Sequence, residues 1–206
     1  MEVKLIQQTS SPIDTIAKIA SICYDSTPKN ASKLVEHLYF NGHHSCFEHV
    51  YFTFFVSGIS RACSHQFVRH RHCSFTQRSQ RYCIEKDLST AFSRTIPPLE
   101  TPLETPFKRI LNDTYAAYKE LLDNNVAPED ARYVLPNACP TELYVSMNLR
   151  ELIHIANERL CSRAQKEIRT LVKKMCELVD KDLHYMLVPK CKSGRLICHS
   201  KCGEGQ

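Results

Sequence analysis

The segment from Arg69 to Tyr82, RHRHCSFTQRSQRY, combines cationic side chains with hydroxyls and amides and contains no carboxylate. Guanidinium groups bind phosphate through paired hydrogen bonds, and serine and glutamine side chains can bond the polar edge of a base. The segment is therefore suited to holding an anionic ligand. From composition alone three interpretations stay open: a site for a phosphorylated small molecule, a solvated basic loop, or a generic patch that binds nucleic acid.

Two further polar clusters lie elsewhere in the chain. Residues 42–49, GHHSCFEH, precede an apolar run, and Asn148, Arg150, His154 and Arg159 fall in a helical pattern in which Arg150 and His154 share one face. Histidines of the first cluster could ligate zinc, but no compact four-ligand spacing emerges. A solvated charged surface is the simplest interpretation of the second cluster. No metal site is predicted.

These residues in this order resemble a known family. Arg69-His70-Arg71, followed after seven residues by Ser79 and then by Arg81-Tyr82, resembles the signature of the flavin-dependent thymidylate synthases, and Gly42-His43 followed by Glu48-His49 resembles a second element of that family. The resemblance implies that this protein is a methyltransferase that reductively methylates dUMP to dTMP. It further implies methylenetetrahydrofolate as carbon donor, FAD as hydride carrier and NADPH as reductant.

The resemblance also implies roles for single residues. The cofactor-binding set is Ser45, Glu48, Arg69, His70, Arg71, His72, Asn148, Arg150 and His154. The substrate-binding set is Gln66, Gln77, Arg78, Ser79, Gln80, Arg81, Arg132 and Arg159. The catalytic set is Arg81, which would polarise the uracil, His43, which would face flavin and substrate, and Ser79, taken as a binding hydroxyl because its motif shows no base. Family members form homotetramers with shared active sites, and the same is expected here.

The whole chain is consistent with such an enzyme. Its 206 residues are 43% hydrophobic and 24% charged, which suits one domain over residues 1–206 with an ordinary core. The longest apolar run, residues 50–56, is too short to cross a membrane, and no basic segment leads into an apolar stretch at the N-terminus. We therefore expect a cytoplasmic protein with no membrane partner. The net charge of +5 favours an anionic ligand, and the separate polar clusters favour a small molecule over nucleic acid.

Apolar periodicity predicts an α+β domain with a mainly antiparallel sheet packed with helices. Val50, Phe52, Phe54 and Val56 should share the buried face of a central strand over 48–57, ended by Ser57-Gly58, and Ser60 should cap the next helix. The signature itself should occupy a helix end and a loop. A second strand is predicted over 142–147, a connecting loop over 95–106, and helices over 12–24, 31–40, 60–69, 107–122, 128–135, 149–160 and 163–186.

Cysteines give two further expectations. Eleven cysteines, an odd number, in a chain without a secretory signal predict reduced thiols. The tail over residues 189–206 carries Cys191, Cys198, His199 and Cys202, which are potential zinc ligands, yet their spacing fits no standard pair-plus-pair site. We expect a flexible reduced tail without metal.

Overall fold

The computed structural model describes residues 1–86, 88, 104–199 and 202, and the chain divides into two compact units. Unit 1 comprises residues 1–2, 56–69 and 76–144, and unit 2 comprises residues 3–55, 70–75 and 145–206. The expectation of one domain over the whole chain stays a prediction.

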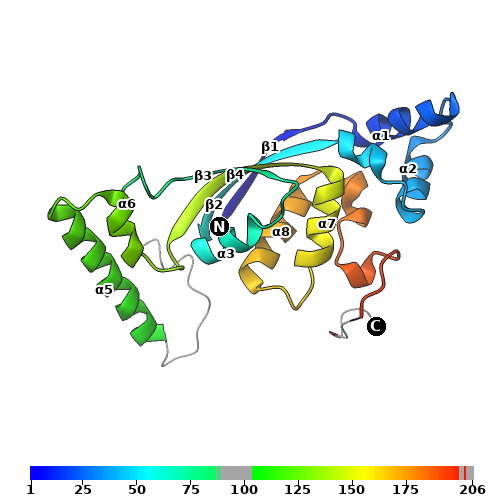
Figure 1. Cartoon of the computed structure of the whole chain (residues 1–206). Coiled ribbons are helices and arrows are strands. Elements are labelled where there is room, and N and C mark those ends of the chain that lie inside the picture. Colours follow the sequence, from blue (N-terminus) through cyan, green and yellow to red (C-terminus); the bar gives the residue numbers. More distant parts are fainter. Residues whose placement is uncertain (87, 89–103, 200–201, 203–206) are drawn as a thin grey trace. The chain divides into compact units, whose positions relative to one another are not determined.

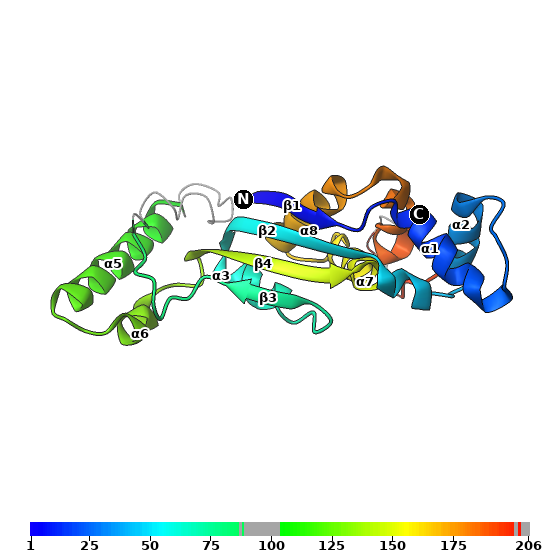
Figure 2. The same ribbon diagram turned by 90° about the horizontal axis from the view of Figure 1, so that it is seen from above.

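A four-stranded antiparallel sheet runs through the chain in the order β1-β2-β4-β3 (Figure 2). Its strands are β1 (Glu2–Gln8), β2 (Tyr51–Ser60), β3 (Ser74–Gln77) and β4 (Pro140–Asn148). The α+β class predicted from the sequence is confirmed. The sequence did not predict β1, and the expectation that the signature forms only a helix end and a loop was wrong, because residues 74–77 are a strand.

Strand β2 is central, as predicted. Val50, Phe52, Phe54 and Val56 are all fully buried, whereas Tyr51 on the opposite face is 56% exposed. The strand does not end at Ser57-Gly58 but continues to Ser60. Gly58 lies inside it with φ +66°, and a Cβ there would come within 3.3 Å of the Met1 nitrogen, so glycine allows the backbone to continue through this bend.

Unit 2 places helices beneath its part of the sheet (Figure 1). Helices α7 (Leu149–Arg159) and α8 (Lys166–Leu178) bury Leu152, Ile155, Leu171 and Met175. The helix expected over 163–186 is interrupted, since Val179 is extended and Asp180 caps a new 3₁₀ turn. The remaining elements of this unit are α1 (Pro12–Ser21), η1 (Ile22–Tyr24), α2 (Ala31–Phe40), η2 (Ser45–His49), η4 (Lys181–Met186) and η5 (Lys190–Lys192).

Unit 1 has its own apolar cluster, formed by Leu88, Leu111 and Cys139 with flanking aromatic residues. Its helices are α3 (Arg61–Phe67), α5 (Glu104–Asp123), α6 (Pro128–Ala131) and η3 (Arg132–Val134). The loop expected over 95–106 is wrong for residues 104–106, which form the first turn of α5, and its remainder lies outside the described residues. Pro106 is tolerated there because first-turn amides have no partner within the helix.

Side-chain caps begin the two helices that follow the long strands. The Ser60 hydroxyl accepts a hydrogen bond from the Cys63 amide at 3.0 Å, as predicted, and Asn148 accepts one from the Glu151 amide at 2.9 Å. Each strand therefore passes directly into a helix whose first turn is fixed in place. All eleven cysteines fall among the described residues and carry thiols rather than disulfides. No helix within the described residues is long and apolar enough to cross a membrane.

Candidate active site

A cavity of about 480 Å³ opens in unit 2 at the start of α7. Its lining combines side chains from η2, from the turn after residue 70 and from the first turns of α7: Glu48, His72, Asn148, Arg150, Glu151 and His154. We name these six residues the flavin cluster, after the expectation from the sequence that five of them bind the cofactor. The structure thus brings together residues that lie about a hundred positions apart, such as Glu48 and Arg150.

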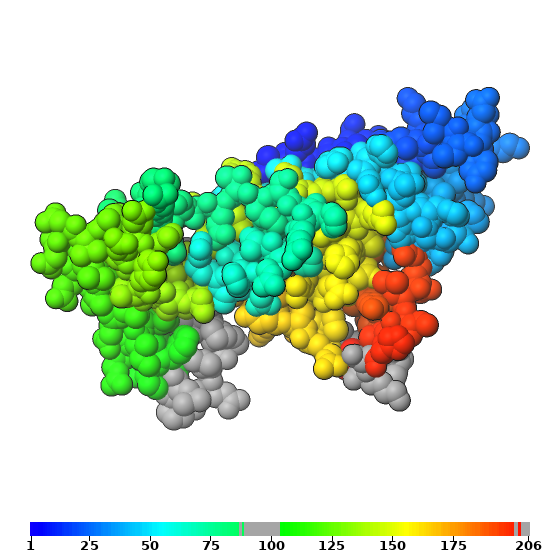
Figure 3. All heavy atoms as spheres, viewed as in Figure 1, coloured from blue at the N-terminus to red at the C-terminus, as the bar shows by residue number. Residues whose placement is uncertain are grey.

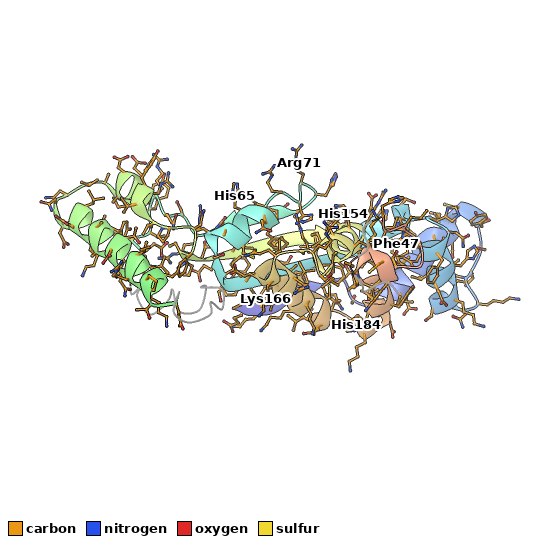
Figure 4. All side chains as sticks on the ribbon, turned by 90° about the horizontal axis from the view of Figure 1, so that it is seen from below. Phe47, His65, Arg71, His154, Lys166 and His184 are labelled. Atoms are coloured by element: carbon orange, nitrogen blue, oxygen red, sulfur yellow. The ribbon has the colours of Figure 1, made fainter. Side chains whose placement is uncertain are left out.

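The N-cap of α7 orients the cations of the cluster. Because Asn148 fixes the first turn, Arg150 and His154 project from the exposed face of the helix, where Arg150 forms an ion pair with Glu48. His154 is visible at this end of α7 in Figure 4. The cavity is therefore lined by a guanidinium and imidazoles that are open to a ligand.

A buried network of polar side chains lies behind this surface. His70 and Glu151 are 6% and 7% exposed, with His70 Nδ1 3.6 Å from a Glu151 carboxylate oxygen. Arg159 donates its Nε–H to His70 Nε2 at 3.0 Å, so the neutral imidazole must carry its proton on Nδ1, facing Glu151. The His154 ring lies edge-on to His70 at 5.8 Å. Arg159, predicted as a substrate ligand, here supports the flavin cluster.

Glu151 was missed by sequence reasoning. The signal was present, since Asn148 followed three residues later by Glu151 has the N-cap and third-position spacing of a capping box. Here the glutamate provides the amide for the cap, while its carboxylate faces His70.

Other predicted cofactor ligands stand apart from this lining. Among the described residues, His43 and Ser45 are exposed and lie outside the set that lines the cavity. Arg71 is exposed and extends away from the ribbon in Figure 4. Arg69 is also exposed and belongs to unit 1.

His44, the neighbour of His43, is fixed by contacts with Tyr39 and Arg195. His44 stacks on the Tyr39 ring at 5.8 Å, and its Nε2 lies 2.6 Å from Nη1 of Arg195. Burial lowers the pKa of His44, and repulsion from Arg195 and Arg150 adds to the decrease, which favours the neutral ring. His44 was not predicted to have a role.

The predicted substrate ligands, except Arg159, all lie in unit 1. There Arg81 forms an ion pair with the Glu129 carboxylate, and Arg132 donates to the Glu129 carbonyl oxygen at 3.0 Å. The Ser79 hydroxyl accepts from the Arg81 amide at 3.2 Å. The structure thus joins Arg81 and Arg132 through Glu129, a residue that sequence reasoning missed, and places the Ser79 hydroxyl against the Arg81 backbone.

The amides of the signature are bonded within the protein. Gln77 donates to the hydroxyls of Ser64 and Thr141, both at 3.1 Å, and buried Gln80 donates to the Cys139 sulfur at 3.2 Å. Burial raises the pKa of Cys139 to about 12, so this partner is a neutral thiol. Gln77 and Gln80 therefore fix the end of β3 and the turn that follows it.

Arg78 lies between two carboxylates. Its guanidinium is 3.6 Å from both Glu85 and Glu142, and burial raises the pKa of Glu85 although Arg78 opposes the shift. Gln66 sits half-buried on α3 and donates to the Ala62 carbonyl oxygen at 3.5 Å. The Arg81 side chain is more exposed than that of Arg78, at 54% against 35%.

A family model described as thymidylate synthase complementing protein matches residues 4–183. The chain belongs to the flavin-dependent thymidylate synthase family. Members of this family include flavin-dependent thymidylate synthases of Geobacter sulfurreducens, 40% identical over 87% of this chain and 82% of the relative, and of Pyrococcus furiosus, 38% identical over 86% and 78%. The resemblance drawn from the signature is confirmed.

Two solved structures share the fold. Thymidylate synthase X (ThyX) of Helicobacter pylori, crystallised with FAD and dUMP, aligns with a TM-score of 0.76 over 91% of this chain and 97% of that one, at 23% identity. PolB of Streptomyces cacaoi, a UMP/dUMP methylase bound with 5-Br dUMP, aligns with a TM-score of 0.71 over 85% and 88%, at 22% identity.

The hydrogen-bond donors of the flavin cluster fit FAD, the dinucleotide in the Helicobacter pylori structure. FAD carries a pyrophosphate and a flavin ring with polar edges, and Arg150, His72 and His154 supply cationic or N–H donors while Asn148 is already engaged as a cap. A cavity of about 480 Å³ lies within the usual range of ligand pockets.

Proposed function

We propose that this chain converts dUMP to dTMP, with methylenetetrahydrofolate as carbon donor, FAD as bound cofactor and NADPH as reductant. The observation that carries the proposal is the flavin cluster with its buried support, in which Arg159, His70 and Glu151 fix the wall of a polar cavity that contains the Arg150 guanidinium. The names of the relatives and the FAD and dUMP in the Helicobacter pylori structure support the same reaction.

The reaction balances with these four components. A carbon–carbon bond forms between the methylene carbon and ring carbon 5 of the uracil, whose hydrogen leaves as a proton. The two bonds from the methylene carbon to the folate nitrogens break, and these nitrogens take up two protons, equal to the one released from the uracil and one from solvent. Reduced FAD, when bound, would supply the hydride that completes the methyl group, and NADPH would restore the reduced flavin. The products are dTMP, tetrahydrofolate and NADP⁺.

The residues of unit 2 would bind and orient the cofactor. Arg150, freed from its exposed pair with Glu48, would hold a phosphate, and His72 and His154 would bond polar atoms from the same cavity. His70 would not touch the ligand, since it is buried, and would instead keep the His154 ring and the first turn of α7 in place. His43 is proposed to face the reacting rings.

The residues of unit 1 would bind the nucleotide. Arg81 would stabilise the negative charge that develops on the uracil, and Arg78 and Arg132 would attract the phosphate. Glu129 orients Arg81 and holds Arg132 through its carbonyl oxygen, so it would align both cations for one ligand. Ser79 would bind through its hydroxyl, and Gln66 would bond the nucleotide.

Assembly and location complete the proposal. FAD and dUMP must lie close together for the methyl group to be completed. We propose that this happens in a homotetramer whose active sites combine residues of several subunits. The small nucleotide and folate substrates are the proposed partners, in the cytoplasm, with no role for nucleic acid.

The test is an oxygen-free turnover assay with chromatographic detection of dTMP. Purified full-length chain receives FAD, NADPH, dUMP and methylenetetrahydrofolate, and each component is omitted in turn. The proposal predicts product in the complete mixture and none in any omission. Product without methylenetetrahydrofolate would refute the carbon donor, and absence of product in the complete mixture from a folded, FAD-bound protein would refute the reaction.

A further inference from the structure

A second cavity of unit 2, of about 340 Å³, gathers three thiols and an imidazole. Cys161, Cys191, Cys198 and His199 all contribute to its lining. None of these four residues lines the cavity of the flavin cluster described above. We infer that these four side chains form a structural zinc site, which ties the C-terminal tail to the end of helix α7.

The fold brings the four ligands together from two separate segments. Cys161 follows the last turn of α7, and Cys191 lies in η5, which packs against α7. Figure 3 shows the tail (red) lying beside the α7 segment (yellow). The spacing of the tail cysteines alone could not indicate this site, because one ligand comes from far upstream in the sequence.

A tight turn returns the tail to the cavity after Cys191. The buried Ser193 hydroxyl donates to the Lys190 carbonyl oxygen at 2.9 Å and accepts from the Leu196 amide at 3.1 Å. Gly194 adopts φ +68°, a conformation that L-residues rarely take. The turn therefore directs Cys198 and His199 back toward Cys191.

Next to the turn, Arg195 anchors the tail to the body of unit 2. Its guanidinium lies 4.6 Å from the centre of the Tyr39 ring, and its Nη1 lies 2.6 Å from His44 Nε2. Tyr39 is fully buried, so the anchor rests on a rigid residue of α2. The tail is thus fixed on both sides of the glycine, which limits the entropy that metal binding must overcome.

The ligand set matches zinc in both chemistry and charge. Three cysteines and one histidine form a tetrahedral structural site, with Zn–S distances of about 2.3 Å and Zn–N distances of about 2.0 Å. Three thiolates around a divalent ion leave one net negative charge, and Arg163 and Lys190 on the same lining offset it, together with Arg159 and against Glu158. Binding releases the three thiol protons to solvent.

The ligand atoms must close around the ion. Among the described residues, the group of three potential ligands already within 4.8 Å of one another is His70, Glu151 and His154, which belongs to the flavin cluster and its support. The atoms of the tail site are more widely separated. The inference requires that exposed His199 and half-buried Cys198 rotate toward Cys161 and Cys191 when the ion binds.

The inference does not depend on the proposed reaction and is tested by the metal content of the full-length chain. The protein is incubated with zinc chloride under a phosphine reductant, desalted, and analysed for zinc and for protein. We expect about one zinc ion per chain. Cys191→Ser should lower the content to background, whereas Cys23→Ser, which removes an exposed thiol outside the cavity, should leave it unchanged. No zinc in the wild type, or equal zinc in Cys191→Ser, would overturn the inference.

Cobalt substitution identifies the ligands even where a variant is poorly folded. Co²⁺ in the wild type should give intense thiolate-to-metal charge-transfer bands and the visible bands of a tetrahedral ion. His199→Ala, at an exposed position, should shift the visible bands and preserve the charge-transfer bands. Bands that disappear in His154→Ala but persist in Cys191→Ser would place the metal in the flavin cluster and refute the tail site. A disulfide among the tail thiols, found by mass spectrometry under the same reductant, would also contradict it.

Discussion

Replacing Arg150 with alanine should weaken FAD binding much more than it weakens the fold. The Arg150 and Glu48 side chains are 55% and 45% exposed, so their ion pair is largely screened by water. Exposed pairs of this kind contribute about 0.2–1 kcal/mol to stability. The free energy of unfolding of the ligand-free variant should therefore fall by less than about 1 kcal/mol.

The effect on the ligand should be larger. A hydrogen bond between a charged side chain and a phosphate contributes about 1.5–3 kcal/mol. Since each 1.4 kcal/mol changes an equilibrium constant tenfold, the FAD Kd of Arg150→Ala should rise by roughly 10- to 150-fold.

Titration of FAD fluorescence measures the Kd, and urea unfolding of the ligand-free protein measures stability. Lys173→Ala is the matched control, because Lys173 forms a similarly exposed pair with Glu177 on α8, at 3.8 Å. Lys173→Ala should leave the FAD Kd unchanged and, like Arg150→Ala, lower the free energy of unfolding by less than about 1 kcal/mol. A wild-type Kd for Arg150→Ala would refute the assignment of this cation, and an equal rise in Kd for Lys173→Ala would show that the effect is not specific to the cavity.

Three further results follow from the geometry. Arg81→Ala should reduce the rate of dTMP formation by about 10²–10³-fold at an unchanged FAD Kd, and loss of FAD together with activity would count against separate roles for the two clusters. Asn148→Ala and Ser60→Ala each remove a helix N-cap hydrogen bond and should each lower the free energy of unfolding by about 1 kcal/mol in urea; unchanged midpoints would contradict this. Burial raises the pKa of Cys73 to about 12, so that only about 10⁻⁴ of this thiol is ionised near pH 8. Iodoacetamide should therefore label exposed Cys23 well before Cys73, as measured by peptide mass spectrometry. Comparable labelling rates would show that Cys73 is accessible and ionised.

Periodicity predicted the elements that bury a continuous apolar face. Helix α2 was predicted at its observed bounds, and the buried face of β2 was predicted residue by residue, because in both the core selects the side chains. Strands β1 and β3 were missed because both lie at edges of the sheet. Neither has a fully buried position, so their pairing depends on backbone hydrogen bonds to a neighbour rather than on a pattern in their own residues.

The candidate site, like the fold, was predicted only in part. The cations were found because the signature fixes their types and order, and the N-cap of α7 then aims Arg150 and His154 into one cavity. Of the carboxylate partners of these cations, Glu48 was predicted, but Glu129 and Glu151 were not. Glu129 is 48 residues from Arg81, and a counter-ion at such a distance is selected by the folded structure and leaves no local spacing.

The most direct test of the proposed reaction follows the transferred carbon. Oxygen-free turnover with methylenetetrahydrofolate labelled with carbon-13 at the methylene position, with unlabelled dUMP, FAD and NADPH, is analysed by mass spectrometry of the nucleotide. Wild-type protein should yield dTMP that carries the label in its methyl group, and Arg81→Ala should yield far less of it. Recovery of only unlabelled dUMP from protein that binds FAD would contradict thymidylate synthesis by this chain.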